Sequence, residues 1–170
     1  MKEYYLIDGY NVINNWQEFA DIREKDLEHT RDLLVSKVAE FSAFHGYESI
    51  VIFDAMEVAG PASMETAGNC TVVFTAEHET ADSWIEKATY RIAGKGIRVF
   101  VVTSDRAEQD YVLGSGGFRI SAREFKELYR RTKKQIDEKV EGLPGHNGRS
   151  ELGSRLNGTV ANYMEQLRRG

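Results

Sequence analysis

Short apolar runs rich in strand-forming residues recur along the chain, and they constrain its fold more than any other feature. Four are clear, at residues 4–7, 49–53, 71–74 and 97–102, and a weaker fifth lies at residues 117–120. Strands that are apolar almost throughout are buried on both faces, as parallel strands are. The pattern therefore predicts a mostly parallel sheet of four to five strands.

Helical periodicity fills most of the intervals between these runs. Apolar residues recur at helical spacing over residues 27–41 and 81–93, and a glycine follows each stretch, Gly46 and Gly94. Alternating strands and helices predict an α/β fold, a three-layer α/β/α arrangement with helices on both faces of the sheet. Residues 55–69, which include a Gly-Pro pair, are expected to form a surface loop.

The C-terminal part of the chain reads as helical. We expect one long helix over residues 121–141, a loop over residues 142–148 and a last helix near residues 153–167. A length of 170 residues suits one domain. We therefore expect residues 1–170 to form a single domain, with a core of about residues 3–125 and a helical extension of about residues 121–170.

Charge and composition exclude several classes of protein. The net charge of −5 does not by itself suggest nucleic-acid binding, but an acidic site and a basic groove can cancel in such a sum. The single cysteine, Cys70, allows no intrachain disulfide. No apolar run approaches the roughly 20 residues that span a bilayer, and the N-terminus lacks the features of a signal peptide. We expect a cytoplasmic protein without membrane association.

Four aspartates fall at positions that one edge of a parallel sheet would bring together. Asp8, Asp54 and Asp105 each come directly after an apolar run, and Asp82 lies at the start of the helix that follows the third run. Ligands bind at the carboxyl edge of such sheets. Clustered carboxylates need a cation or shifted pKa values, and oxygen ligands suit Mg²⁺ or Mn²⁺. The pattern favours metal-assisted phosphate-ester chemistry.

Structural interpretations of the same residues stay open. An aspartate after a strand often accepts hydrogen bonds from turn amides, and Asp82 has favourable charge at a helix N-terminus. Glu108 and Asp110 are assigned to the helix after Asp105, with Asp110 as a candidate for indirect contact with the site. His78-Glu79 lacks the second histidine of a zinc protease motif, and the glycines of residues 114–117 are assigned to a turn.

Four motifs, taken in order, resemble one known family. They are residues 6–13, which contain Asp8-Gly9-Tyr10-Asn11, then Phe53-Asp54, residues 79–82, and Thr103-Ser104-Asp105. Together they resemble the NYN domains of the PIN-like nuclease superfamily, and more narrowly the YacP-like branch. The resemblance in motifs covers roughly residues 3–125.

The resemblance implies a PIN-like fold, dependence on Mg²⁺ or Mn²⁺, and endonucleolytic cleavage of RNA. YacP-like members include endoribonucleases that act on mRNA engaged with the ribosome. Matched by motif position, Asp8 and Asp82 would be the principal metal-site acids and Asp105 a further acid, while Asp54 would bind through water. Asn11 would orient a phosphate or a hydrated metal, and Thr103 and Ser104 would support the site by hydrogen bonds.

RNA contacts are expected along the long C-terminal helix. Its basic stripe comprises Arg123, Lys126, Arg130, Lys133 and Lys134, and all of these except Lys133 are taken as the RNA-binding set. Acidic residues are interspersed, so a solvated helix face is an equal interpretation. Tyr10 and Trp16 are aromatic candidates for base stacking, although packing is the simpler role for Trp16. Two other functions stay open: a non-catalytic RNA- or ribosome-binding module with a relict acidic site, and a small-molecule phosphatase.

Overall fold

The computed structural model describes residues 1–55, 60–94 and 96–142, and within them six strands form one sheet. The strands are listed in chain order: β1 (Lys2–Asp8), β2 (Glu48–Phe53), β3 (Ser63–Ala67), β4 (Cys70–Phe74), β5 (Ile97–Val102) and β6 (Phe118–Ile120). Their order across the sheet is β3-β4-β2-β1-β5-β6, and every neighbouring pair is parallel except β3 and β4. The predicted mostly parallel sheet, including its weak fifth strand, is confirmed.

The expectation of a surface loop over residues 55–69 is wrong where β3 forms. All five residues of β3 are exposed, so the strand has no apolar pattern that could signal it. It forms because its backbone pairs antiparallel with β4, and Gly68, with φ of +60°, and Asn69 make the tight connection between the two strands. β3 is thus an edge strand added by a hairpin to the parallel sheet.

Helices follow most strands. They are α1 (Gly9–Asn15), the 3₁₀ turn η1 (Gln17–Phe19), α2 (Ala20–Lys25), α3 (Leu27–His45), α4 (Ala81–Ile92), α5 (Arg106–Gly114) and α6 (Ala122–Glu141). The predicted helices α3, α4 and α6 are confirmed, and α3 ends at Gly46, whose φ of +71° suits glycine. The predicted loop over residues 142–148, apart from Gly142, and the predicted helix near residues 153–167 lie outside the described residues.

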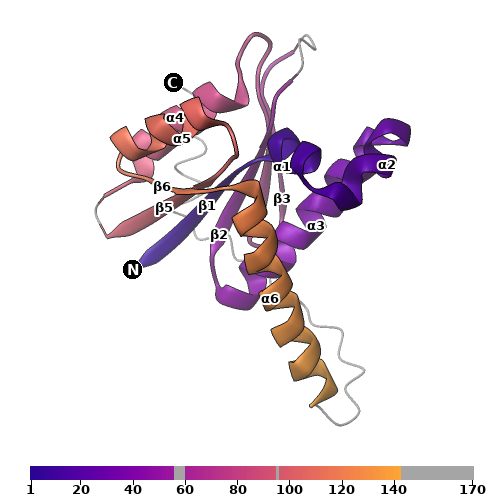
Figure 1. The fold of residues 1–170 in the computed structure, drawn as a ribbon. Coiled ribbons are helices and arrows are strands. Elements are labelled where there is room, and N and C mark those ends of the chain that lie inside the picture. Colours follow the sequence, from indigo (N-terminus) through magenta and orange to yellow (C-terminus); the bar gives the residue numbers. More distant parts are fainter. Residues whose placement is uncertain (56–59, 95, 143–170) are drawn as a thin grey trace.

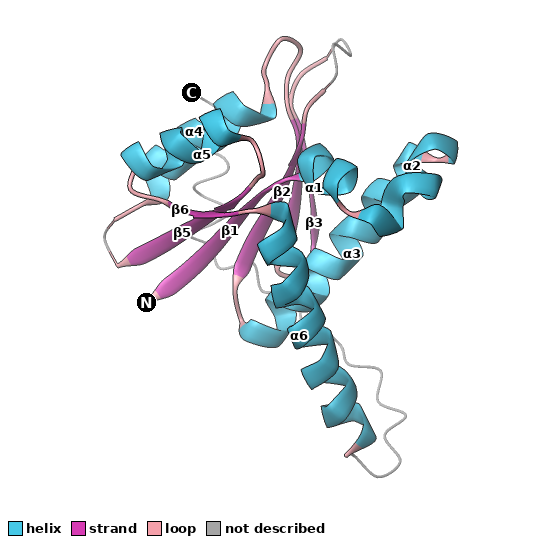
Figure 2. Cartoon of the chain, viewed as in Figure 1, coloured by secondary structure: helices cyan, strands magenta, loops and turns pink. Residues whose placement is uncertain are grey.

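The helices form two layers around the sheet, as Figures 1 and 2 show. On one face α1, α3 and α6 pack over a core that includes Tyr5, Ile7 and Phe125. On the other face α4 and α5 cover a core that includes Leu6 and Ile52. Alternate residues of β1 thus enter different cores, as a strand buried on both faces requires. The three-layer α/β/α arrangement is confirmed.

Trp16 belongs to the first core rather than to a binding surface. Its side chain is 1% exposed and lies between Phe19 and Phe125. The indole Nε1 donates a hydrogen bond of 2.8 Å to the carbonyl oxygen of Ala122, so it also fixes the start of α6. The packing role that the sequence favours for Trp16 is therefore confirmed, and its burial leaves no ring face for a base.

None of the described helices has both the length and the apolar character needed to cross a bilayer.

Candidate active site

The carboxyl edge of the sheet gathers the segments that carry the predicted acids. Asp8 is the last residue of β1 and also the N-cap of α1, where its Oδ1 accepts a hydrogen bond of 3.4 Å from the Asn11 amide. Asp8 therefore accepts a backbone amide, as one interpretation of the sequence predicts, and its role as a metal ligand stays a prediction. The sequence had suggested only a turn at this point, and the short helix α1 is an addition.

Gly9 lets the chain make this transition from strand to helix. A Cβ atom on Gly9 would lie 2.3 Å from Cε1 of Phe53, far below any normal contact. Phe53 is fully buried and packs between Tyr10 and Phe74, so its ring has little room to move. A glycine directly after Asp8 is thus required for β1 and β2 to end side by side.

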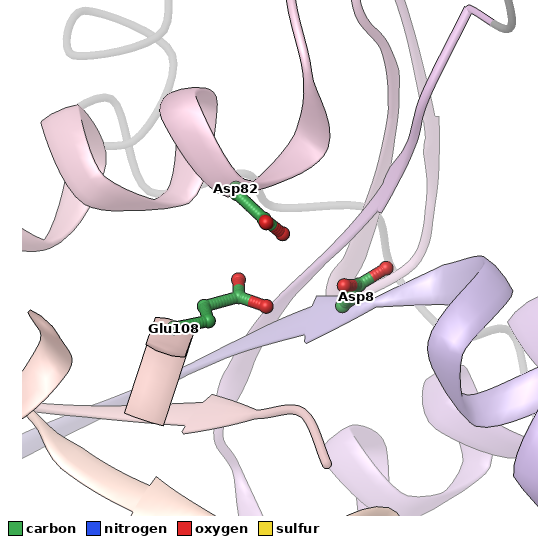
Figure 3. Close-up of side chains that lie close together, drawn as sticks. All are labelled: Asp8, Asp82 and Glu108. Atoms are coloured by element: carbon green, nitrogen blue, oxygen red, sulfur yellow. The ribbon is translucent and has the colours of Figure 1, made fainter. Parts of the chain in front are cut away.

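Three carboxylates converge at this edge: Asp8 from β1, Asp82 from the first turn of α4, and Glu108 from α5 (Figure 3). One carboxylate oxygen from each lies within 4.8 Å of those of the other two, and we call this set the acid triad. Asp82 is exposed, Asp8 is half-buried and Glu108 is 6% exposed. The triad thus extends from the surface into the interior.

Two acids of the triad, Glu108 and Asp8, have a raised pKa, chiefly because they are buried. Burial raises the pKa of Glu108, and the charges of Asp8 and Asp82 raise it further, against an opposing effect of the Thr103 hydroxyl. Burial also raises the pKa of Asp8; the Asn11 amide and the Glu108 carboxyl oppose this, while the charges of Asp82 and Asp105 add to it. The metal-free triad therefore retains a proton that isolated carboxyl groups would lose.

The residues present fit a divalent cation. Both carboxylate oxygens of Glu108 are buried, and among the described residues neither has a hydrogen-bond partner at standard distance and angle. Buried carboxylates are normally paired or bound to a metal. Mg²⁺ and Mn²⁺ take carboxylate oxygens as ligands. A cation between the three groups would satisfy Glu108 and remove the mutual repulsion.

Asp54 and Asp105 lie beside the triad, outside the group of converging oxygens found among the described residues. Asp105 is exposed and is the N-cap of α5, where its Oδ1 accepts from the Glu108 amide at 3.2 Å. Asp54 Oδ2 accepts from the Ala81 amide at 3.4 Å, directly before Asp82. Both are near enough for indirect roles.

Glu108 is the member of the triad that the sequence pattern does not indicate, because the pattern assigns this residue only to a helix. The signal was present but ambiguous. Glu108 lies three residues after the helix cap Asp105, the position where a glutamate usually reaches back to the cap amide. In this structure the Asp105 amide instead donates to Thr103 Oγ1 at 3.2 Å, and the Glu108 side chain points toward Asp8 and Asp82.

Asn11, Ser104 and Thr103 form a supporting network around the acids. Asn11 Oδ1 accepts a hydrogen bond of 2.8 Å from the Ser104 amide, and Ser104 Oγ accepts one of 3.1 Å from the Ala122 amide. The network ties α1 to the turn after β5 and to the start of α6. Because its oxygen is engaged in this way, Asn11 would reach a substrate through its side-chain NH₂ group.

The predicted RNA-binding stripe of α6 is partly occupied by ion pairs. Arg130 lies 3.3 Å from Glu127, and Lys126 lies 4.0 Å from Glu18. Arg123 and Lys134 are exposed. Exposed pairs of this kind contribute little energy and exchange readily for other anions. RNA binding by the stripe stays a prediction.

Comparison with known proteins identifies the family of this chain. The model of the YacP-like NYN domain matches residues 5–169. The protein YacP of Bacillus subtilis (strain 168) is 34% identical over 165 residues, which cover 97% of this chain and 96% of that protein. The crystal structure of Rae1 (YacP) from Bacillus subtilis matches with a TM-score of 0.73 at 33% identity, covering 98% of this chain and 95% of that one.

A crystal structure of a single-substitution mutant of the same Bacillus subtilis protein also matches. Its TM-score is 0.73 at 34% identity, and the match covers 84% of this chain and 83% of that one. The agreement in sequence and in fold extends over nearly the whole length of both proteins. The chain therefore belongs to the YacP-like NYN domain family, within the PIN-like nuclease superfamily, and this membership supports a nuclease-type role.

Proposed function

We propose that this protein is a metal-dependent endoribonuclease that cleaves phosphodiester bonds of mRNA in the context of the ribosome. The observation that carries the proposal is the acid triad, in which both oxygens of the buried Glu108 carboxylate lack a hydrogen bond of standard distance and angle among the described residues. Membership of a nuclease superfamily supplies the reaction class. The ribosome and the cytoplasmic location that it implies rest on the resemblance to YacP-like proteins.

In this proposal Asp8, Asp82 and Glu108 hold Mg²⁺ or Mn²⁺. The ion would lower the pKa of a bound water and stabilise charge on a phosphoryl oxygen. Asp105 adds negative potential at Asp8 that favours a cation, and Asp54 is held beside Asp82 by the Ala81 amide. Asn11, fixed by the Ser104 amide, offers its NH₂ group as a donor to a phosphate oxygen. The exposed side of Asp82 leaves the metal open to a long substrate.

The test is cleavage of RNA with and without ribosomes. The purified protein is incubated with free mRNA and with mRNA on translating ribosomes, in Mg²⁺, in Mn²⁺ and in EDTA, and the cut positions are mapped. We expect cuts that need the metal and vanish in Asp8→Asn. The matched control is Asp21→Asn, which removes the same charge from an exposed position on α2.

Three results would contradict the proposal. The first is intact RNA in every condition, and RNA that is bound but not cut would then favour a non-catalytic binding module. The second is cleavage by Asp8→Asn at the wild-type rate, which would separate the activity from the triad. The third is metal-dependent turnover of simple phosphate esters without cleavage of RNA, which would indicate a phosphatase.

A further inference from the structure

A hollow lies beside the acid triad, and none of the three triad residues lines it. It is a cavity of about 350 Å³, within the size range of small-ligand sites, and we call it the Arg31 pocket. The residues that give it its chemistry are Tyr10 of α1, Arg31 of α3, Phe74 of β4, and Asp54 after β2. It therefore combines two aromatic rings, one guanidinium group and one carboxylate.

The wall of the Arg31 pocket is held in place before any ligand binds. The Arg31 guanidinium lies 5.6 Å from the centroid of the Phe74 ring and donates a hydrogen bond of 3.1 Å to the Tyr10 hydroxyl. Tyr10 and Phe74 both pack on the buried ring of Phe53, with centroids 5.1 and 5.5 Å away. The flat groups thus support one another and offer surfaces on which another flat group can stack.

The pocket borders the triad through three short connections. Tyr10 follows Asp8 by two residues. Asp54 accepts from the amide of Ala81, the residue before Asp82. β2 and β4, whose ends line the pocket, are the first and second neighbours of β1. The pocket therefore begins about 5–10 Å along the sheet edge from Asp8, as one to two strand spacings require.

We propose that the Arg31 pocket binds one unpaired base of the RNA substrate next to the phosphate held at the triad. The inference rests on the proposed function and adds a base-binding subsite to it. Proteins recognise single-stranded RNA by stacking splayed bases on aromatic rings and arginine planes and by hydrogen bonds to base edges. The Arg31 pocket supplies the stacking groups, and Asp54 lines it as the one carboxylate among the described residues of the pocket. A base is uncharged, so it can enter beside acids that would repel a phosphate.

The test measures binding rather than cleavage, so that it does not depend on catalysis. Full-length protein with Asp8→Asn is titrated into a fluorescent single-stranded RNA and into a matched abasic strand, and anisotropy gives both affinities. Arg31→Ala removes one stacking surface. Ser63→Trp adds a large side chain at the lining of the pocket, on the exposed edge strand β3, and leaves Arg31, Tyr10 and Phe74 in place.

We expect both variants to weaken binding of the base-bearing RNA by roughly tenfold to a hundredfold, the range for loss of one stacked base. Ser63→Trp should not change binding of the abasic strand, and Arg31→Ala should weaken that binding only as much as the loss of one positive charge does. The control is Lys37→Ala, which also removes a positive charge from α3 and a contact with a ring, that of Tyr129. It should affect both strands alike, because its charge does not distinguish bases. Circular dichroism melting verifies that each variant folds.

The outcomes separate the base-binding subsite from the enzyme activity. If Arg31→Ala and Ser63→Trp bind the base-bearing RNA with the affinity of the parent protein, the subsite is overturned and the nuclease proposal stays intact. A base-dependent loss of binding in a protein that cuts no RNA would retain the subsite and overturn the nuclease. Equal losses for base-bearing and abasic strands would also overturn the subsite, because the variants would then act on charge or folding. So would a parent protein that binds no RNA.

Discussion

Helices α5 and α6 begin with the same spacing of residues and use it differently. Each has an N-cap residue followed three positions later by a glutamate: Asp105 and Glu108 in α5, Ser121 and Glu124 in α6. In α6 the two residues bond reciprocally, with the Glu124 amide 3.1 Å from Ser121 Oγ and the Ser121 amide 2.7 Å from Glu124 Oε2. This is a complete capping box, and it lowers the pKa of Glu124.

In α5 only half of that box is made. Asp105 accepts from the Glu108 amide, but the Asp105 amide is bound by Thr103 Oγ1, so Glu108 has no role as a cap. Its carboxyl group lies with Asp8 and Asp82 instead, and burial raises its pKa. The comparison teaches that a helix-start pattern does not decide whether its glutamate is structural. In α5 the hydroxyl of Thr103 decides the role of Glu108, because it accepts the hydrogen bond of the Asp105 amide.

The largest expected effect comes from neutralising each glutamate in turn. Glu108→Gln should lower metal-dependent RNA cleavage by about a hundredfold or more, because loss of a metal ligand exceeds the ten- to hundredfold cost of changing its neighbours. Glu124→Gln should keep its activity, since its carboxylate serves only the cap of α6. Cleavage rates at saturating Mn²⁺ measure both. Equal rates for the two variants would remove Glu108 from the proposed metal site.

The two glutamates should also give stability opposite dependence on pH. Glu108 and Asp8 have raised pKa values, so their contribution to the stability of the metal-free protein is largest where both are protonated and is lost as pH rises above about 4.5 through the raised values. Each unit of raised pKa costs about 1.4 kcal/mol once the group is charged. The lowered pKa of Glu124 contributes in the other sense, and its stabilisation is lost as pH falls below about 4.5.

Urea unfolding in EDTA from pH 4 to pH 9 measures this dependence. We expect the free energy of unfolding to fall with pH in the wild type and to fall less in Glu108→Gln. Mn²⁺ at high pH should restore stability to the wild type, because a ligand that binds only the folded state stabilises it. A flat profile in EDTA would mean that the triad carries no buried charge.

A smaller effect is expected from converting the start of α5 into that of α6. Thr103→Val keeps the volume of a fully buried side chain but removes the hydroxyl that binds the Asp105 amide. Glu108 should then turn back to that amide, and metal affinity should fall about tenfold, as for other changes that orient ligands. Calorimetric titration with Mn²⁺ measures it. The control is Thr132→Val, another buried threonine, on α6, which should not change metal affinity.

The fold was predictable where burial leaves a pattern. β1, β2, β4 and β5 are apolar runs because helices cover both faces of the sheet, and α3, α4 and α6 show one apolar face each. β3 gave no such signal, because all of its residues are exposed and only its backbone is paired. The helix α1 could not be predicted because it begins directly after Asp8, and the pair Asp8-Gly9 is equally typical of a turn.

The site was predictable where the sheet topology alone places a residue. Asp8 ends a strand and Asp82 starts a helix at the same edge, and both belong to the triad. Asp54 and Asp105 obey the same rule but turn to backbone amides, at Ala81 and at Glu108. Which way an acid turns depends on the amides around it, and one sequence does not show them. Glu108 could not be predicted because the amide that its carboxylate would normally cap, that of Asp105, donates to Thr103 Oγ1 instead.

The smallest expected effect comes from breaking the cap of α6 itself. Ser121→Ala removes the hydroxyl that accepts from Glu124, and such losses cost about 1 kcal/mol. The cost should lie at the low end, because Ser104 Oγ still accepts from the neighbouring Ala122 amide and Trp16 still donates to the Ala122 carbonyl. Urea unfolding measures the loss, and Mn²⁺ titration should show unchanged affinity. If metal affinity falls with the cap, the hydrogen bond from Ala122 to Ser104 transmits the change to Asn11 and Asp8. The start of α6 would then belong to the site as fully as the start of α5.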